Sequence, residues 1–126
     1  MSKLVLIVED SETCAETLLI ALESLPGVEP RVIPNLRAAV ATIKEAGNVA
    51  ALVTDLHLGN SALSDGFDLI SQLRAQPQYA NLPIVLISGD SDPQLAARAI
   101  AQGANAFFPK PYSPAAVRKT LEQLIC

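Results

Sequence analysis

Five side chains that could take part in phosphoryl or metal chemistry stand at or just after the ends of short apolar runs. They are Glu9, Asp10, Asp55, Ser88 and Lys110. Apolar runs bounded by turn-forming residues are typical of strands that are buried on both faces of a parallel sheet. Ligands bind beyond the carboxyl ends of such strands in open α/β sheets. Acids at these positions are therefore expected to bind a ligand or to react with it.

Three acids around one lysine would repel one another. Two carboxylates about 4 Å apart repel by about 1 kcal/mol in water and by about 4 kcal/mol near a protein surface. Magnesium would relieve this repulsion, because it is held by one or two carboxylates together with waters and phosphate oxygens. A phosphoryl group would use the whole set: the metal and Lys110 on its oxygens, the Ser88 hydroxyl as a donor, and an aspartate as the nucleophile.

The elements that must position these side chains alternate along the chain. Apolar runs predict strands at residues 4–8, 31–33, 50–55, 83–87 and 106–108. A stripe of apolar residues at helical spacing follows each run. Strict alternation of this kind indicates an α/β fold with a doubly wound, five-stranded parallel sheet of order 2-1-3-4-5, which is flavodoxin-like. This order gathers the five side chains around one crevice.

The fourth predicted helix has the clearest boundary signals. Asp92 is a candidate N-cap, Pro93 would occupy the first helical position, and Gly103 would end the helix. The side chains expected on its buried face are Leu95, Ala96, Ala99 and Ile100.

Length and composition restrict the class of protein. The 126 residues, half of them apolar, suit one domain over residues 1–126. The net charge of −4, from 9 basic and 13 acidic residues without a basic cluster, argues against nucleic-acid binding. No stretch is apolar for long enough to predict a membrane span. Cys14 and Cys126 have no partner at metal-ligand spacing, so we expect a reduced, cytoplasmic protein.

These motifs resemble the receiver domain of two-component response regulators. The resemblance rests on the pair Glu9-Asp10, on Asp55 and Ser88, and on the run from Ala99 to Pro111, which fall on four predicted strands in the right order. It extends over the whole chain and is closest to the stand-alone, chemotaxis-regulator-like type, because no output segment follows the last predicted helix. Signalling through protein contacts is therefore expected.

The resemblance implies a role for each matching residue. Asp55 would accept a phosphoryl group from a sensor histidine kinase or a phosphotransfer protein, and Lys110 would bind the phosphate. The chain would not be an enzyme in its own right, but would assist its own phosphotransfer and slow autodephosphorylation. Ser88 and Phe107 would act as switch residues. They would couple the site to a face of the fourth helix, fifth strand and fifth helix, which binds a downstream protein or a second copy of the chain.

The resemblance also implies a magnesium site. Asp10 would bind Mg²⁺ directly and Glu9 through water, and Asp55 and the backbone carbonyl of His57 would complete the protein ligands. We expect the His57 side chain to be neither a metal ligand nor a phosphoryl donor, because no second His or Cys stands near it in the sequence.

The sequence departs from the family pattern at two places, and it contains one turn whose geometry the resemblance predicts. Gly66 follows only after an extended segment from Gly59 to Asp65, where the family has a shorter connection. His57 stands two residues after the acceptor, at a position that affects phosphate arrival and loss in the family. The resemblance further predicts a cis peptide bond between Lys110 and Pro111, which would aim the lysine into the site.

Three other functions could use the same fold. An aspartyl-phosphate hydrolase typically has a second acid two residues after the nucleophile, where this chain has His57. A flavodoxin-like electron carrier needs a phosphate-binding loop rich in glycine and hydroxyl groups after the first strand, where this chain has Glu9-Asp10-Ser11-Glu12. The third alternative is a pseudo-receiver that is never phosphorylated and acts as an interaction module.

Overall fold

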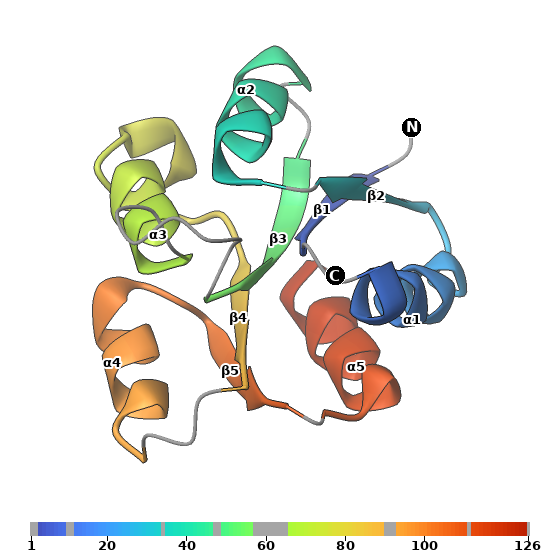
Figure 1. Ribbon diagram of the computed structural model, residues 1–126. Helices are drawn as coiled ribbons and strands as arrows, with labels where there is room; N and C mark the ends of the chain where they lie inside the picture. Colours follow the sequence, from blue (N-terminus) through green and yellow to red (C-terminus); the bar gives the residue numbers. More distant parts are fainter. Residues whose placement is uncertain are drawn as a thin grey trace.

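The computed structural model describes residues 3–9, 12–33, 35–46, 49–56, 66–89, 93–110 and 112–125. Figure 1 shows a central sheet with helices on both sides. Within these ranges the strands are β1 (Lys3–Val8), β2 (Val28–Ile33), β3 (Val49–Asp55), β4 (Ile84–Ser88) and β5 (Ala106–Pro109). The helices are α1 (Glu12–Glu23), α2 (Leu36–Ala46), α3 (Gly66–Arg74), the short 3₁₀ helix η1 (Pro77–Tyr79), α4 (Leu95–Gln102) and α5 (Pro114–Ile125).

The strands form one parallel sheet in the order β2-β1-β3-β4-β5. This confirms the predicted doubly wound α/β fold. Every residue of β4 is buried, as expected for a strand covered on both faces. Because the strands run in the same direction, the residues that end β1, β3, β4 and β5 meet at one edge of the sheet.

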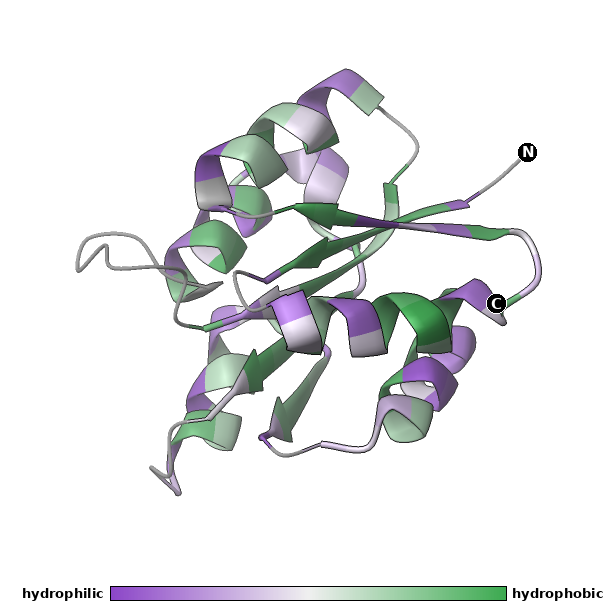
Figure 2. Ribbon diagram, turned by 45° about the vertical axis from the view of Figure 1, so that its right-hand side comes forward, coloured by the Kyte–Doolittle hydropathy of each residue, from purple (hydrophilic) through white to green (hydrophobic). Residues whose placement is uncertain are grey.

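The helices divide into two layers. Helices α1 and α5 cover one face of the sheet, and α2, α3 and α4 cover the other (Figure 1). Alternate side chains of β1 follow this division: Leu4 and Leu6 join the core beneath α2–α4, whereas Val5 and Ile7 join the core beneath α1 and α5. Figure 2 shows that the central strands are largely apolar and that the helices are of mixed polarity. Burial of these side chains, each contributing roughly 1.5–3 kcal/mol, fixes the side that each helix covers.

The start of α4 differs from the prediction. The helix begins at Leu95, and Pro93 lies in the preceding turn, so the expectation that Pro93 is the first helical residue was wrong. Gln94 occupies the N-cap position with a helical backbone and provides no side-chain cap hydrogen bond. Asp92, the predicted cap, lies outside the described residues.

The buried face of α4 is also narrower than predicted. Leu95 and Ala99 are 3% and 0% exposed, but Ile100 is 54% exposed and Ala96 is exposed as well. The helix has only eight residues, and the pair at positions i and i+4 is sufficient to cover the sheet. The apolar surface of Ile100 therefore faces solvent.

Arg74, at the end of α3, joins four segments of the chain. Its guanidinium group donates hydrogen bonds to the carbonyl oxygens of Gly103 (2.8 and 3.1 Å), Tyr79 (2.6 Å) and Leu82 (2.7 Å), and to Oδ1 of Asn105 (3.1 Å). Gly103 ends α4 with a φ of 117°, and a Cβ atom there would lie 2.9 Å from Cγ of Arg74. Glycine is therefore needed both for the backbone conformation and for the approach of Arg74. The cluster fixes the end of α4 beside the start of β4.

Candidate functional site

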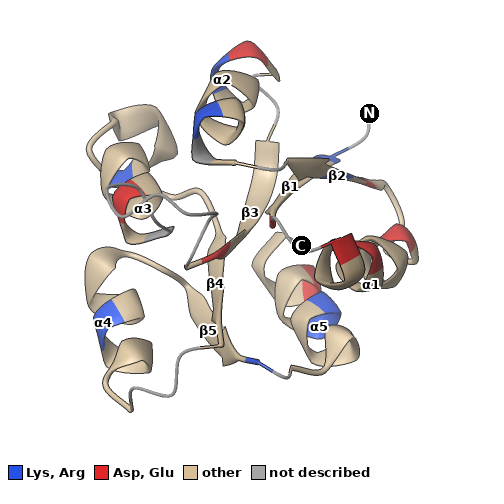
Figure 3. Ribbon diagram, viewed as in Figure 1, with Lys and Arg blue, Asp and Glu red and all other residues tan. Residues whose placement is uncertain are grey.

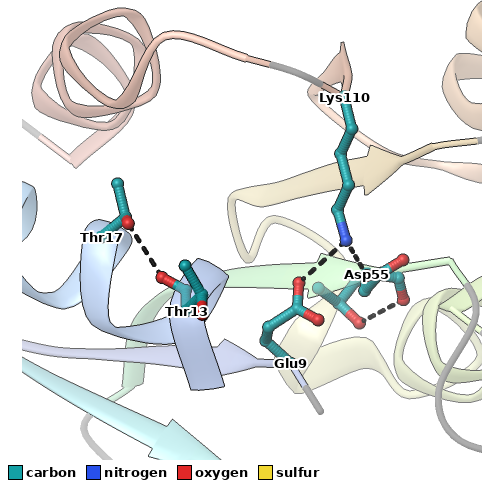
Figure 4. Close-up of polar contacts among 6 residues, drawn as sticks. Glu9, Thr13, Thr17, Asp55 and Lys110 are labelled. Carbon is teal, nitrogen blue, oxygen red and sulfur yellow. Dashed lines mark hydrogen bonds and ion pairs between the residues drawn. The ribbon is translucent and has the colours of Figure 1, made fainter. Parts of the chain in front are cut away.

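The sheet edge brings four of the predicted side chains together. Glu9 follows β1 directly, Asp55 ends β3, Ser88 ends β4, and Lys110 follows β5. Figure 4 shows Lys110 reaching from the end of β5 towards Asp55, with Glu9 beside it. The predicted gathering at the carboxyl ends of these strands is thus present in the structure for the four that are described.

Lys110 is shared between two buried carboxylates. Its Nζ atom lies 2.6 Å from Oδ2 of Asp55 and 3.4 Å from Oε2 of Glu9. The Asp55 and Glu9 side chains are only 6% and 2% exposed, whereas that of Lys110 is 25% exposed. One positive and two negative charges leave a net charge of −1 on this group, so it can accept another cation.

The electrostatics favour a charged lysine. Burial by itself would lower the pKa of Lys110, but the hydrogen bond to Asp55 and the charges of Asp55 and Glu9 outweigh it and raise this pKa above its usual range. Lys110 therefore remains a cation at every physiological pH. A fixed positive charge against the Asp55 carboxylate suits the binding of a further anionic group at that carboxylate.

The backbone of the sheet holds the site in place. The amide of Lys110 donates to the carbonyl oxygen of Ser88 at 2.8 Å, which extends the β4–β5 pairing to the lysine. The amide of Leu56 donates to the carbonyl oxygen of Ile87 at 2.8 Å and extends the β3–β4 pairing beyond Asp55. Ser88 is fully buried, and Phe107 on β5 is half-buried against the core beneath α2–α4.

Comparison with known proteins gives the family of the chain. The model of the response regulator receiver domain matches residues 5–122. The chain belongs to the response regulator receiver domain family. Members of this family are phosphoacceptors in two-component signalling and generally bind Mg²⁺ at the acidic phosphorylation site. The resemblance proposed from the sequence motifs is confirmed.

Individual relatives include full-length regulators and single receiver domains. An NtrX-like response regulator of Rickettsia conorii is 29% identical over 113 residues, which is 90% of this chain and 23% of the relative. The chain thus spans about a quarter of the length of that curated relative. Among solved structures, a response regulator from Chloroflexus aurantiacus has a TM-score of 0.86 at 26% identity, covering 99% of this chain and 98% of that one. The chemotaxis response regulator CheY4 of Vibrio cholerae has a TM-score of 0.82 at 26% identity, with 98% and 99% covered.

Three predicted features of this receiver domain lie outside the described residues. They are the metal ligand Asp10, the modulating residue His57 with its backbone carbonyl, and the Lys110–Pro111 cis peptide bond. The extended segment from Gly59 to Asp65 is outside them too. Each of these stays a prediction.

The described residues of the receiver domain fit magnesium in their chemistry. In the ranges that the structure describes, no three His, Cys, Asp or Glu side chains form a group that could hold a metal by themselves. Glu9 and Asp55 nevertheless offer buried carboxylate oxygens beside Lys110, and carboxylate oxygens are the donor type that Mg²⁺ prefers. Asp10, next to Glu9 in the sequence, would supply a third carboxylate.

Sequence reasoning did not single out two further residues at this edge. The Tyr112 hydroxyl is buried and has no hydrogen-bond partner among the described residues, and burial raises the pKa of Tyr112 to about 12. Thr54, directly before Asp55, is fully buried and donates a hydrogen bond to the Asp55 carbonyl oxygen at 3.0 Å. The signal in the sequence that could have identified Thr54 is a hydroxyl residue inside an otherwise apolar run.

A hollow of about 410 Å³ lies beside the lysine, between α1 and the start of α5. Its lining residues are Thr13, Cys14, Thr17, Gly89, Lys110, Tyr112 and Pro114. Cys14 of α1 is half-buried at this hollow. Within α1, the Thr17 hydroxyl donates to the Thr13 carbonyl oxygen at 2.8 Å (Figure 4).

The surface of the receiver domain carries scattered charge. Figure 3 shows acidic positions on α1 and basic positions distributed over α2, α4 and α5. None of the helices in the described part of the chain has the length and apolar character needed to cross a membrane.

Proposed function

We propose that this receiver domain accepts a phosphoryl group on Asp55 from the phosphohistidine of a sensor kinase or a phosphotransfer protein. The observation that carries the proposal is the contact of Lys110 with Asp55 at 2.6 Å, made in a buried site that also holds Glu9. Structural ion pairs are usually exposed and contribute little. A buried group of two carboxylates and one lysine at the sheet edge is better explained by a binding site for a metal ion and a phosphoryl group, in which the carboxylates hold the metal and the lysine contacts the phosphoryl oxygens.

The transfer needs few steps from the protein. A carboxylate oxygen of Asp55 attacks phosphorus, the N–P bond of the donor histidine breaks, and the imidazole leaves with its electron pair and takes up a proton. The product is an acyl phosphate on Asp55, and Lys110 and the Ser88 hydroxyl bind its oxygens. Attack of water on phosphorus later breaks the O–P bond, releases inorganic phosphate and restores the carboxylate. The domain assists both reactions on itself and acts on no separate substrate.

Magnesium would be held at the acidic end of the site. Its ligands would be Asp10 directly, Glu9 through water, Asp55, and the backbone carbonyl of His57. When bound, Mg²⁺ neutralises charge on the phosphoryl oxygens during transfer. The chain's own contribution is the pair of buried carboxylates, whose negative charge Lys110 only partly offsets.

Acetyl phosphate labelling tests the proposal. The wild-type chain should gain one phosphoryl group by intact mass in the presence of Mg²⁺, and a chelator should prevent it. Asp55→Asn should not be labelled, whereas the matched control Asp68→Asn, which changes an aspartate of α3, should be labelled normally. Full labelling of Asp55→Asn would reject the acceptor, and no labelling of the wild type would favour the pseudo-receiver alternative.

The output would pass through Ser88 and Phe107. Phosphorylation adds roughly 1.5 to 2 negative charges and three acceptor oxygens. The buried Ser88 hydroxyl would be the neutral donor that responds. Movement of Ser88 would free space for Phe107, which already packs partly against the core and carries no hydroxyl that would need a partner. The face of α4, β5 and α5 would then bind a downstream protein or a second copy of the chain. The exposed Ile100 of α4 would supply apolar contact area.

The remaining expectations concern the setting of this function. We propose that the receiver domain is cytoplasmic and does not bind nucleic acid. The net charge of −4 and the scattered basic residues support the absence of a nucleic-acid surface (Figure 3).

A further inference from the structure

Thr54 is a polar residue inside a strand that is otherwise apolar up to the acceptor. The β3 sequence is VAALVTD, and Thr54 is 0% exposed. It pairs with Val8 of β1 on one side and with Leu86 of β4 on the other, so it lies in the middle of the sheet. Burial of a hydroxyl is unfavourable unless the hydroxyl makes a hydrogen bond. Valine would fill the same space without that cost.

The hydroxyl of Thr54 has a specific partner. It donates to the carbonyl oxygen of Asp55 at 3.0 Å. The amide of the same peptide unit, that of Leu56, donates to the Ile87 carbonyl oxygen at 2.8 Å. The peptide between Asp55 and Leu56 is therefore held at both its C=O and its N–H.

The direction of the Cα–Cβ bond of Asp55 is set by its N, Cα and C atoms, and therefore by both peptides that flank the residue. Strand pairing fixes the preceding peptide. The two hydrogen bonds described above fix the Asp55–Leu56 peptide and with it the position of the Asp55 carbonyl carbon. The carboxylate at the far end must meet Lys110 at 2.6 Å. If this peptide shifted, the Asp55 carbonyl carbon would move with it and the Cα–Cβ bond would turn, which would move the carboxylate relative to the lysine.

We infer that Thr54 is a positioning residue for Asp55: its hydroxyl holds the Asp55–Leu56 peptide so that the carboxylate stays in register with Lys110. The inference rests on the proposed role of Asp55 as the acceptor. Thr54 touches no reacting atom and acts only through the backbone of the neighbouring residue.

Two substitutions separate the hydroxyl from the packing. Thr54→Val keeps the shape and removes the donor, and Thr54→Ser keeps the donor and removes a buried methyl group. We expect Thr54→Val to be labelled by acetyl phosphate about tenfold more slowly, since small misplacements of reacting groups cost rates of this order or more. Thr54→Ser should stay within about twofold of the wild type even though it leaves a small cavity. Thr42→Val is the matched control, because it removes a threonine hydroxyl that bonds to Ala38 in α2.

A second readout does not depend on phosphorylation. The carbon-13 shifts of the Asp55 carbonyl and carboxyl carbons should both move in Thr54→Val, and return towards wild-type values in Thr54→Ser. Wild-type labelling rates or an unmoved carboxyl resonance in Thr54→Val would overturn the inference. The inference would also be overturned if Thr54→Ser were labelled as slowly as Thr54→Val, because lost packing would then explain the slower labelling. Failure of the wild type to be labelled would instead reject the role of Asp55.

Discussion

Lys110 neutralises only one of the two buried carboxylates that it touches, and this determines how the site responds to substitution. Asp55 takes the shorter contact, at 2.6 Å, and Glu9 the longer one, at 3.4 Å. If the lysine turns towards a phosphoryl group on Asp55, Glu9 loses part of its counter-charge, which a metal ion would replace. The shared lysine thus links the binding of a phosphoryl group at Asp55 to the binding of a metal ion near Glu9.

Removal of the lysine should destabilise the fold. In Lys110→Met, two carboxylates lose their cation. Breaking a fully buried pair costs about 3–5 kcal/mol, and we expect about 1–3 kcal/mol here because the lysine is partly exposed. Urea unfolding measures the loss, with Lys44→Met in α2 as the exposed control. The double variant Lys110→Met/Asp55→Asn should recover part of the stability, and no recovery would show that carboxylate repulsion is not the cause.

The pH dependence of this ion pair follows from the direction of the lysine shift. The pKa of Lys110 is raised in the folded state, so its contribution to stability is fully present below the unfolded pKa of about 10.4 and is lost as the pH rises through the folded value. Between pH 7 and 9 the unfolding free energy should therefore show no loss that depends on Lys110.

Helix α4 is held differently at its two ends. Its carboxyl end is fixed by Gly103 and by the hydrogen bonds of Arg74, whereas the N-cap residue Gln94 gives no side-chain cap bond. Two further contacts join it to α3: the Arg98 guanidinium lies 4.9 Å from the Phe67 ring centre, and the Ser71 hydroxyl bonds to Gln102 at 3.1 Å. Arg74 therefore fixes the carboxyl end of α4 against the start of β4.

Substitution of Arg74 tests whether this residue fixes the carboxyl end of α4. Arg74→Lys cannot reproduce a fork that serves Tyr79, Leu82, Gly103 and Asn105, so partly buried carbonyl oxygens would lose their donors. We expect a loss of about 2–3 kcal/mol in unfolding free energy, given roughly 1–3 kcal/mol for each unsatisfied group and partial compensation by the lysine. Arg118→Lys, which loses one exposed hydrogen bond to Ser24, is the matched control. Equal stability of the two variants would contradict the role of Arg74.

At this scale, sequence patterns predicted the types of the elements better than their ends. The alternation of apolar runs and helical stripes gave the strands and helices in order. The start of α4 was wrong because proline at a turn and proline at a first helical position carry the same local signal. The exposure of Ile100 was missed because spacing alone does not say how wide a face the sheet can cover. The start of β2 at Val28 and the helix η1 were not predicted either.

The whole molecule shows why the gathering of site residues was predictable. In a parallel sheet of known order, residues that follow the strands must meet at one edge, so Glu9, Asp55, Ser88 and Lys110 could be placed together without a structure. Contacts made by long side chains or within one peptide unit could not be predicted. The roles of Arg74 and Thr54 depend on carbonyl directions, which leave no trace in the sequence.

Coupling across the molecule can be followed by NMR with beryllofluoride as a phosphate mimic. We expect amide shifts around Asp55, over residues 95–100 of α4 and at Phe107, with small changes at the Arg74 end of α4. In Ser88→Ala the shifts near Asp55 should persist, while those of α4 and Phe107 shrink, because the responding hydroxyl is gone. Shifts confined to the surroundings of Asp55 in the wild type would contradict a coupled output face.

The central claim is that the phosphoryl group is carried by Asp55 as an acyl phosphate. Borohydride reduces an aspartyl phosphate to homoserine and leaves free carboxylates unchanged, so peptide mapping after acetyl phosphate and borohydride treatment locates the modified residue directly. We predict homoserine at position 55, dependent on Mg²⁺ and absent from untreated protein. Homoserine at another aspartate, or none at all in a folded, magnesium-loaded sample, would contradict the account.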